Sequence, residues 1–385
     1  MSPPARRHVS YSGQMLDLVG RRGLGLLALV AIVLALGLIV RFGPALAFSA
    51  ALAAPRLEGW LTWVSRAPVR ESVFLPVEGR RLEADLYRPA SGTPRGAIVL
   101  VHGLSRAGRR HVELMRLAQL LAREGEFVLV PQLDGLAAFR LSGDEVADIR
   151  ASARYLAGVS HGPVAIAGFS FGAGPALLAA ADLPGLPVAG SFGGYADLRN
   201  VIAYVTTGVF TFHGQRYQRR QEDYNRWKLL ALLVGFVTSA PDRARLAAIA
   251  DRKLADPSAT TEDLEGGLGD EGRAVTALVL NRREEAVDAL IERLSPTARA
   301  ALAGLSPLSA VRRLSGRLLV AHGADDDSIP FTESLRLAEA TQGRASIAVF
   351  RTFHHTGPEP LWHSLSARAA DAWNLFRLAD ELLAH

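Results

Sequence analysis

The chain has 385 residues, of which 49% are hydrophobic and 21% charged, so it is long enough for one large domain or two ordinary ones. It has no cysteine, which excludes disulfides, thiolate metal sites and a cysteine nucleophile. Its formal net charge of +5 comes mostly from scattered arginines, without a long basic run or an interleaved aromatic stripe, so no nucleic-acid partner is expected.

An unbroken apolar segment lies near the N-terminus. Residues 23–40 are 18 consecutive uncharged positions. A helix of that length spans roughly 27 Å, close to the thickness of a membrane's hydrocarbon core. The flanking arginines are Arg6, Arg7, Arg21 and Arg22 before the segment and Arg41 and Arg56 after it. The positive-inside rule therefore predicts a single-pass anchor, with residues 1–22 in the cytoplasm and the bulk of the chain on the outer side, periplasmic or extracellular.

A cleaved signal peptide, followed by secretion, is the alternative to this anchor. The sequence Ala-Leu-Ala at 51–53 resembles a small-residue cleavage site. The apolar core is longer than that of a usual signal peptide, and Arg41 interrupts the approach to the site, so the anchor is favoured. Residues 41–66, with Pro44 and Pro55, are then expected to form a membrane-proximal connector.

Short strands alternate with helical patterns from Val69 onward. A hairpin is predicted at 72–89, with Glu78 and Gly79 near its turn. The predicted strands that follow cover 96–103, 127–135 and 164–167, and the predicted helices cover 114–125, 142–156 and 173–181. Ser142 and Glu145 have the spacing of a capping box at the start of the second helix. This alternation predicts a doubly wound, mostly parallel α/β sheet, whose first part covers residues 67–198.

The alternation stops after a strand predicted within 187–198. Residues 199–306 show mostly helical patterns and are predicted to form a helical cap above the carboxyl ends of the strands. Its apolar runs, 201–212 and 229–240, are too short to span a membrane and are expected to pack the cap, line a pocket or form a lipid-facing entrance. The polar stretch 213–228 is expected to be a solvated helix, or a contact for anionic head groups.

The strand–helix alternation resumes in the last part of the chain. The predicted elements are a strand and its loop at 316–330, a helix at 331–341, a strand at 345–350 and a helix at 361–384. Residues 307–385 are therefore expected to complete the sheet.

Ser170 lies between Gly168 and Gly172 in the pattern G-x-S-x-G, directly after the strand predicted at 164–167. A serine hydroxyl is a poor nucleophile until it is held beside a base, and a sharp strand-to-helix turn holds it in place. The alternative is a chance occurrence of a five-residue pattern. No Gly-Lys-Ser/Thr follows, and the glycines do not have dinucleotide-binding spacing, so neither a cofactor nor a metal ion is expected.

Two further groups of polar residues follow later strands. Asp325, Asp326 and Asp327 come after a buried strand, where one carboxylate can orient a base; otherwise they form a solvated acidic turn. His354 and His355 follow the last strand, where a histidine pair could equally be exposed. Because a serine, an aspartate and a histidine each follow a strand, in that order, we predict a Ser-His-Asp triad.

These motifs resemble those of serine hydrolases with the α/β-hydrolase fold, such as esterases, lipases and dienelactone hydrolases. The matching stretches are the elbow GFSFG, VHGL at 101–104, HGADDDSIP at 322–330 and the late histidine pair. The family pattern H-G-x-x-D-x-x-V-P implies that Asp326 is the acid, with Asp325 and Asp327 as alternatives. The usual spacing after the last strand implies His355 as the base, with His354 as its rival and His363 as a weaker candidate.

The resemblance also implies an oxyanion hole. Its donors would be the backbone N–H groups of Phe171, which follows the nucleophile, and Leu104, which follows a strand end. Here the motif is HGL and not HGGG, so the second donor is less well defined by the pattern.

Together these features predict a membrane-anchored serine hydrolase that cleaves carboxylic ester bonds through an acyl-enzyme. His355 would take the proton of Ser170 while Asp326 orients the imidazole. The expected substrate is a small-molecule ester or a lipid-like molecule. The alternatives are a thioesterase, an acyltransferase or a peptidase with the same triad, or a membrane-tethered binding protein that has lost its activity. No oligomeric state is predicted.

Overall fold

A computed structural model describes residues 12–59, 66–90, 94–351, 353–354, 357–358 and 365–384. An eight-stranded sheet organises the chain from Val69 to Phe350, in the order β1-β2-β4-β3-β5-β6-β9-β10. The strands are β1 Val69–Val77, β2 Arg80–Arg88, β3 Gly96–Val101, β4 Glu126–Pro131, β5 Val164–Phe169, β6 Val188–Phe192, β9 Arg317–Gly323 and β10 Ala345–Phe350. β1 is antiparallel to β2, and β2 to β4; all the other pairs are parallel.

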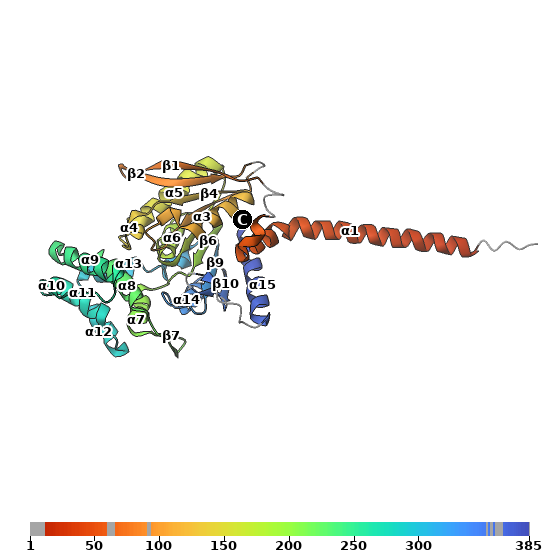
Figure 1. The fold of residues 1–385 in the computed structure, drawn as a ribbon. Coiled ribbons are helices and arrows are strands. Elements are labelled where there is room, and N and C mark those ends of the chain that lie inside the picture. Colours follow the sequence, from red (N-terminus) through yellow and green to blue (C-terminus); the bar gives the residue numbers. More distant parts are fainter. Residues whose placement is uncertain are drawn as a thin grey trace, which may run out of the picture.

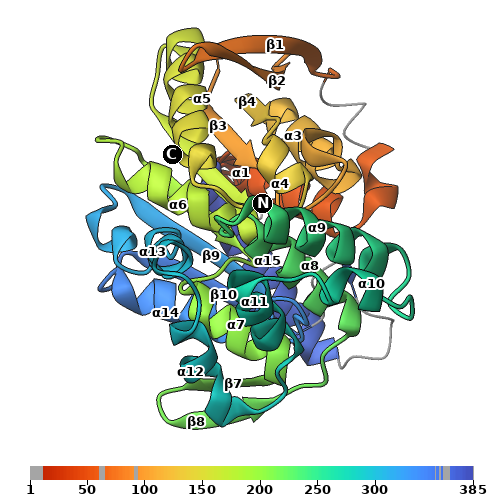
Figure 2. The same ribbon diagram turned by 90° about the vertical axis from the view of Figure 1, so that its left-hand side faces the viewer.

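The central strands consist of apolar residues because both faces of the sheet are covered. Ile98, Val99, Leu100 and Val101 of β3 are at most 1% exposed, and each such side chain contributes about 2 kcal/mol when fully buried. The helices that contact the sheet are α3 Val112–Arg123, α5 Asp144–Ser160, α6 Ala173–Ala181, α14 Thr332–Ala340 and α15 Leu365–Leu382. Residues of α5, α6 and α14 belong to one buried cluster, and those of α3 and α15 to another on the opposite face. The sheet is therefore doubly wound, as predicted (Figures 1 and 2).

The local predictions hold for most elements of the sheet. The β1–β2 hairpin turns at Glu78 and Gly79, whose φ angles of +45° and +79° suit a two-residue turn. The helix predicted at 142–156 begins instead at Asp144, because Gly143 is its N-cap with φ = +99°. Glu145 still accepts the N–H groups of Ser142 and Gly143, at 3.2 and 2.9 Å. The strand predicted at 127–135 ends at Pro131, and a short helix, α4 Asp134–Ala137, follows it.

The N-terminal helix is longer than the membrane span predicted at residues 23–40. α1 Ser12–Ala53 has 42 residues and continues through Pro44, where a connector is predicted. Within it, Leu29–Ala53 is long and apolar enough to span a membrane, and it projects away from the sheet (Figure 1). Its last turns are buried against the body of the protein, since Ala45, Phe48 and Ala51 are at most 2% exposed.

The segment between β6 and β9 forms a separate layer at the end of the molecule opposite α1 (Figure 1). Its helices are α7 Leu198–Thr207, α8 Asp223–Val234, α9 Ala240–Ala255, α10 Glu262–Glu265, α11 Asp270–Leu280, α12 Val287–Glu292 and α13 Pro296–Gly304. It is mostly helical, as predicted, and its boundaries at 199 and 306 stay predictions.

This insertion also contains a hairpin that the sequence did not predict. β7 Val209–Phe212 pairs with β8 Gln215–Gln218, so the stretch 213–228 is not one solvated helix. Phe210 stacks on Tyr217 across the hairpin, with ring centroids 5.0 Å apart. This cross-strand pair stabilises a conformation that the polar residues around it did not indicate.

Candidate active site

Ser170 lies in a sharp turn between a strand and a helix. β5 ends at Phe169, a short 3-10 turn covers Ser170–Gly172, and α6 begins at Ala173. The φ angle of Ser170 is +51°, which residues other than glycine rarely adopt. A strained backbone of this kind persists only where the surrounding structure holds it.

The two glycines of the G-x-S-x-G pattern are required by close backbone contacts. A Cβ atom on Gly168 would lie 2.5 Å from the Cα of Ala173, and one on Gly172 would lie 2.1 Å from the carbonyl oxygen of His102. No side chain fits at such distances, so the turn closes tightly on both sides of Ser170.

The loop after β3 lies against this turn. A Cβ atom on Gly103 would be 2.9 Å from the Cβ of Ser170 and 3.5 Å from its Oγ. Leu104 is the next residue of this loop, and Phe171 directly follows Ser170. The two residues predicted to provide oxyanion donors therefore belong to the two segments that meet at Ser170.

His102 fixes the position of this loop. Its Nε2 accepts the N–H of Leu133 at 3.1 Å, so Nδ1 carries the proton and donates to the carbonyl of Gly103 at 2.8 Å. Burial lowers the pKa of His102 to about 4. The ring is therefore neutral near pH 7 and has a structural role, which the sequence motif alone did not reveal.

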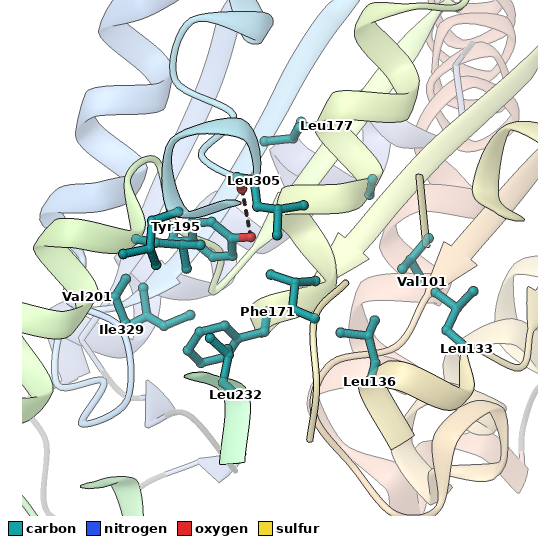
Figure 3. Packing of buried hydrophobic residues seen from close by; sticks show 14 of the residues in the cluster. Val101, Leu133, Leu136, Phe171, Leu177, Tyr195, Val201, Leu232, Leu305 and Ile329 are labelled. Atoms are coloured by element: carbon teal, nitrogen blue, oxygen red, sulfur yellow. Dashed lines mark hydrogen bonds between the residues drawn. The ribbon is translucent and has the colours of Figure 1, made fainter. Parts of the chain in front are cut away.

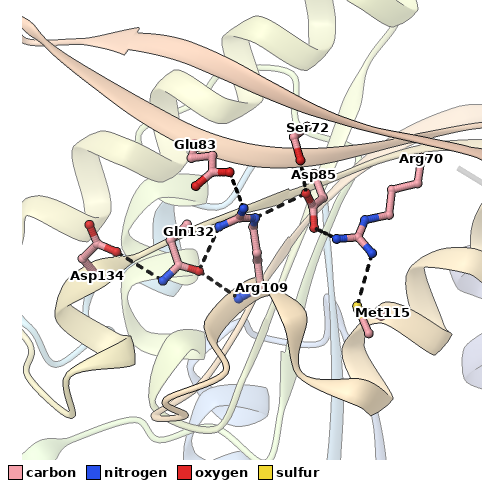
Figure 4. A network of polar contacts seen from close by, with 8 residues as sticks. All are labelled: Arg70, Ser72, Glu83, Asp85, Arg109, Met115, Gln132 and Asp134. Atoms are coloured by element: carbon pink, nitrogen blue, oxygen red, sulfur yellow. Dashed lines mark hydrogen bonds and ion pairs between the residues drawn. The ribbon is translucent and has the colours of Figure 1, made fainter.

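A buried arginine connects the same loop to neighbouring strands (Figure 4). Arg109 is 6% exposed; it pairs with Glu83 and lies 3.3 Å from the carboxylate of Asp85. Its backbone N–H donates to Gln132 at 3.2 Å, and Asp85 also accepts from Arg70 at 2.8 Å. The loop after β3 is thus connected to β2 and to the segment after β4, and removing one partner would leave a buried charge unpaired.

Of the three aspartates after β9, Asp326 is the one held in the interior. It is 3% exposed, and its Oδ1 accepts the N–H groups of Ser328 and Ile329 at 2.8 and 2.9 Å. Asp325 pairs with Arg219. Asp327 is exposed.

A single loop lies between Asp326 and Ser170. β6 separates β5 from β9 in the sheet, and its loop contains two glycines. A Cβ atom on Gly193 would be 3.7 Å from Oδ2 of Asp326, and one on Gly194 would be 3.7 Å from the carbonyl oxygen of Ser170. Two strand spacings, about 10 Å, therefore separate the ends of β5 and β9, and the loop of β6 lies between Ser170 and Asp326.

The insertion holds the aspartate loop through three residues that the sequence did not single out. The hydroxyl of Tyr204 donates to the carbonyl of Asp326 at 2.7 Å. Asn225 donates to the carbonyl of Asp327, and Arg219 to that of Ala324, both at 3.0 Å. These bonds join residues about a hundred positions apart, so no local pattern could indicate them.

His322, the histidine of the H-G-x-x-D pattern, is fully engaged in the same loop. Its Nε2 donates to the carbonyl of Ile329 at 3.0 Å, so its Nδ1 accepts the hydroxyl of Ser334 at 2.6 Å. The same Nε2 lies 3.4 Å from Oδ2 of Asp326. His322 therefore orients the loop and is not available as a base.

The candidate catalytic histidines are placed only in part. The backbone of His354 lies in β11 Phe353–His354, which pairs with β12 Gly357–Pro358 and lies beside β9. His355 and His363 lie outside the described residues. The described backbone of Phe353 and His354 therefore runs next to the strand that leads to Asp326.

Two other features of the described residues bear on ligands. They contain no group of three or more His, Cys, Asp or Glu side chains that could hold a metal ion. A pocket of about 540 Å³ lies in the insertion, lined by Thr206, Thr207, Gln218, Arg219, Arg220, Gln221, Glu222, Asp223, Arg226 and Arg282. Neither Ser170 nor Asp326 lines this pocket, so we do not assign it to the serine site.

The sheet order, the strained serine after β5 and the aspartate after β9 define a class. This is the α/β-hydrolase fold, in which the nucleophile turn follows a central strand and the acid follows a later one.

No protein-family model and no curated protein matches the sequence. Several solved structures are similar to it in fold. The uncomplexed acylaminoacyl peptidase of Pyrococcus horikoshii has a TM-score of 0.49 at 15% identity, over 83% of this chain and 42% of that one. This chain thus spans about two fifths of the length of that peptidase.

Two further structures are similar over most of both chains. The 2,6-dihydroxy-pseudo-oxynicotine hydrolase has a TM-score of 0.47 at 16% identity, over 86% of this chain and 72% of that one. The esterase domain of a Rhodothermus marinus protein has a TM-score of 0.43 at 15% identity, over 82% of this chain and 96% of that one. At these identities the likeness concerns the fold alone.

Proposed function

We propose that this protein is a membrane-anchored serine hydrolase that cleaves carboxylic ester bonds of small molecules through an acyl-enzyme. The observation that carries the proposal is Ser170 at φ = +51°, held after a central strand where only glycines fit on either side. A strained backbone at such a place stays in a protein when it positions a reacting group.

The roles of the other residues follow from where charge develops. His355, with His354 as its rival, takes the proton as the Ser170 hydroxyl attacks the ester carbonyl. Asp326, held by two backbone N–H groups, orients the imidazole and stabilises its charged form. The N–H groups of Phe171 and Leu104 stabilise the oxyanion, and losing one such donor costs about 3 kcal/mol of barrier.

Covalent labelling tests the nucleophile. A fluorophosphonate probe should label the wild-type protein at Ser170, because such probes react only with an activated serine. Ser170→Ala should abolish both labelling and ester turnover, whereas Ser258→Ala, which changes an exposed serine of the insertion, should leave both unchanged. Labelling at another serine would overturn the assignment. Faster turnover of a matched thioester or peptide than of the ester would move the proposal to one of those classes.

A second prediction concerns the acid and the base. Asp326→Asn and His355→Ala should each lower turnover by about a thousandfold or more, as loss of a triad member does elsewhere. Asp325→Asn and His354→Ala are the matched controls and should stay within a few-fold of wild type. If His354→Ala abolishes turnover while His355→Ala stays active, the base is His354.

A further inference from the structure

Helix α8 crosses the carboxyl edge of the sheet. Near its start, Asn225 donates to the carbonyl of Asp327 at 3.0 Å, so this end lies at the loop after β9. Directly after its last residue, a Cβ atom on Gly235 would lie 3.0 Å from the carbonyl oxygen of Leu141, in the segment that follows β4. The helix therefore runs from the β9 side of the site to the β4 side.

Counted in strand spacings, the middle of α8 falls near the end of β5. The strands from β9 to β4 are in the order β9-β6-β5-β3-β4, so β5 is the central one of the five. Four strand spacings make about 19 Å, and the 12 residues of α8 make a helix about 18 Å long. The midpoint of the helix falls at Lys228 and Leu229, and β5 leads directly to Ser170.

Lys228 lies on the face of α8 that points to the site. Asn225, which contacts the aspartate loop, is three positions before Lys228, and Leu232 is four positions after it. Residues at this spacing share one face of a helix. Leu232 belongs to the same buried cluster as Phe171, the residue after the nucleophile (Figure 3).

The ammonium group of Lys228 is partly withdrawn from water. In the described part of the chain no carboxylate forms an ion pair with it; it lies 4.9 Å from the ring centre of Tyr224. Burial lowers the pKa of Lys228, while the charges of Asp327 and Asp326 oppose the shift. A half-buried cation that forms no direct ion pair with any described carboxylate is costly, and an anionic ligand would offset that cost.

We propose that Lys228 binds a negatively charged group of the substrate, so that the enzyme favours esters that carry a carboxylate a few atoms from the scissile carbonyl. This inference rests on the proposed function of Ser170. Lys228 is one of only two lysines in a chain with 43 Lys and Arg residues. The other, Lys253, donates to the carbonyl of Pro257 at 3.3 Å on α9 and serves as a matched control.

The test compares two esters of equal length on the full-length protein in detergent. Monophenyl glutarate carries a free carboxylate, and methyl phenyl glutarate carries the same chain with the carboxylate capped; phenol release is measured for both. Lys228→Met should lower kcat/KM for the anionic ester by about tenfold or more, the loss expected for a charge-assisted hydrogen bond. Its kcat/KM for the capped ester should stay within about twofold, and Lys228→Arg should recover most of the preference. Lys253→Met should change neither value.

The outcomes separate this inference from the function on which it rests. If the wild-type protein neither reacts with the fluorophosphonate probe nor releases phenol from either ester, the proposed function fails. If the wild type turns over both esters and Lys228→Met lowers both equally, Lys228 only holds the insertion in place. If Lys228→Met changes neither, no substrate anion binds there. Either of the last two results overturns the inference.

Discussion

Ser170 combines a strained backbone with tight packing of the turn on both sides, while the residue itself is only half-buried. Positive φ angles also occur at Glu78 and His161, but these lie in a hairpin turn and at a helix C-cap, where the conformation is common. At Ser170 the strain, of order 1–3 kcal/mol, follows a buried strand. The carbonyl of His102 and the backbone of Ala173 leave the turn no room to relax.

A buried carboxyl group should make the stability of the fold depend on pH. Glu126 at the start of β4 is 1% exposed, and burial raises its pKa from 4.5 to about 7. Between these values the unfolded chain loses the proton and the folded chain keeps it, so stability falls as pH rises from about 4.5 to 7. Above pH 7 the full loss of folding stability from the buried Glu126 charge is present, on the order of 3 kcal/mol.

Glu126→Gln removes this titration and keeps the shape of the side chain. In thermal unfolding in detergent, the variant should gain more in Tm over wild type at pH 8.5 than at pH 4.5. His102 has the opposite dependence, losing stability as pH falls from 6.5 to about 4. Because His102 is present in both proteins, its effect cancels in the comparison. An equal shift in Tm at both pH values would contradict the assignment.

Helices α7 and α8 belong to the insertion but contact the loop after β9, which carries Asp326. They hold the loop of Asp326 through Tyr204 and Asn225, whereas the strand itself ends at Gly323. The insertion is therefore more than a cover, because it helps to set the direction of the aspartate. The same helix α8 carries Lys228, the residue that we propose binds a substrate anion.

Tyr204→Phe tests this positioning role. It removes the hydrogen bond to the carbonyl of Asp326 and leaves the ring in its aromatic cluster, 5.1 Å from the ring of Phe210. We expect kcat to fall roughly fivefold with little change in KM, since one hydrogen bond is worth about 1 kcal/mol. The control is Tyr217→Phe, which keeps the ring stack of the β7–β8 hairpin. A loss of stability with an unchanged kcat would show that Tyr204 only packs.

In the molecule as a whole, α1 is joined firmly to the body. Arg41 pairs with Asp380 of α15, and Arg116 of α3 donates to the carbonyl of Leu52 at 3.2 Å. By contrast, the large apolar side chains between Leu29 and Val40 are 47–76% exposed, a surface that water disfavours and a bilayer would cover. The insertion lies at the end of the molecule opposite α1 (Figure 1). If α1 spans the bilayer, the apolar runs of the insertion lie away from the membrane. This arrangement disfavours a lipid-facing entrance there.

The proposed orientation in the membrane is tested by protease access. With α1 spanning and residues 1–22 in the cytoplasm, protease added to intact spheroplasts of a bacterial host should digest the body of the protein. A cytoplasmic marker protein should stay intact in the same sample. Digestion only after lysis would show the opposite topology. Recovery of the body of the protein in the soluble fraction would favour signal cleavage.

Much of the fold could be predicted from local pattern. α6 and β10 have the predicted bounds of 173–181 and 345–350, because continuous apolar strands and small-residue helices are specified by their own residues. The Ser170 turn could be predicted equally well, since its glycines are required by contacts within a few positions of the serine and with one strand end. The sequence alone thus determined the class of fold and the nucleophile candidate.

Other features were decided only when distant segments came together. Asp326 differs from Asp325 and Asp327 through burial and two backbone N–H groups, none of which appears in the run of three acids. The β7–β8 hairpin depends on a stacked pair of rings, and the continuation of α1 past Pro44 goes with burial of its end against α15. The inferred placement of Lys228 near Ser170 depends on α8 running from the loop after β9 to the segment after β4. Each of these depends on contacts between residues far apart in the chain, which no local periodicity contains.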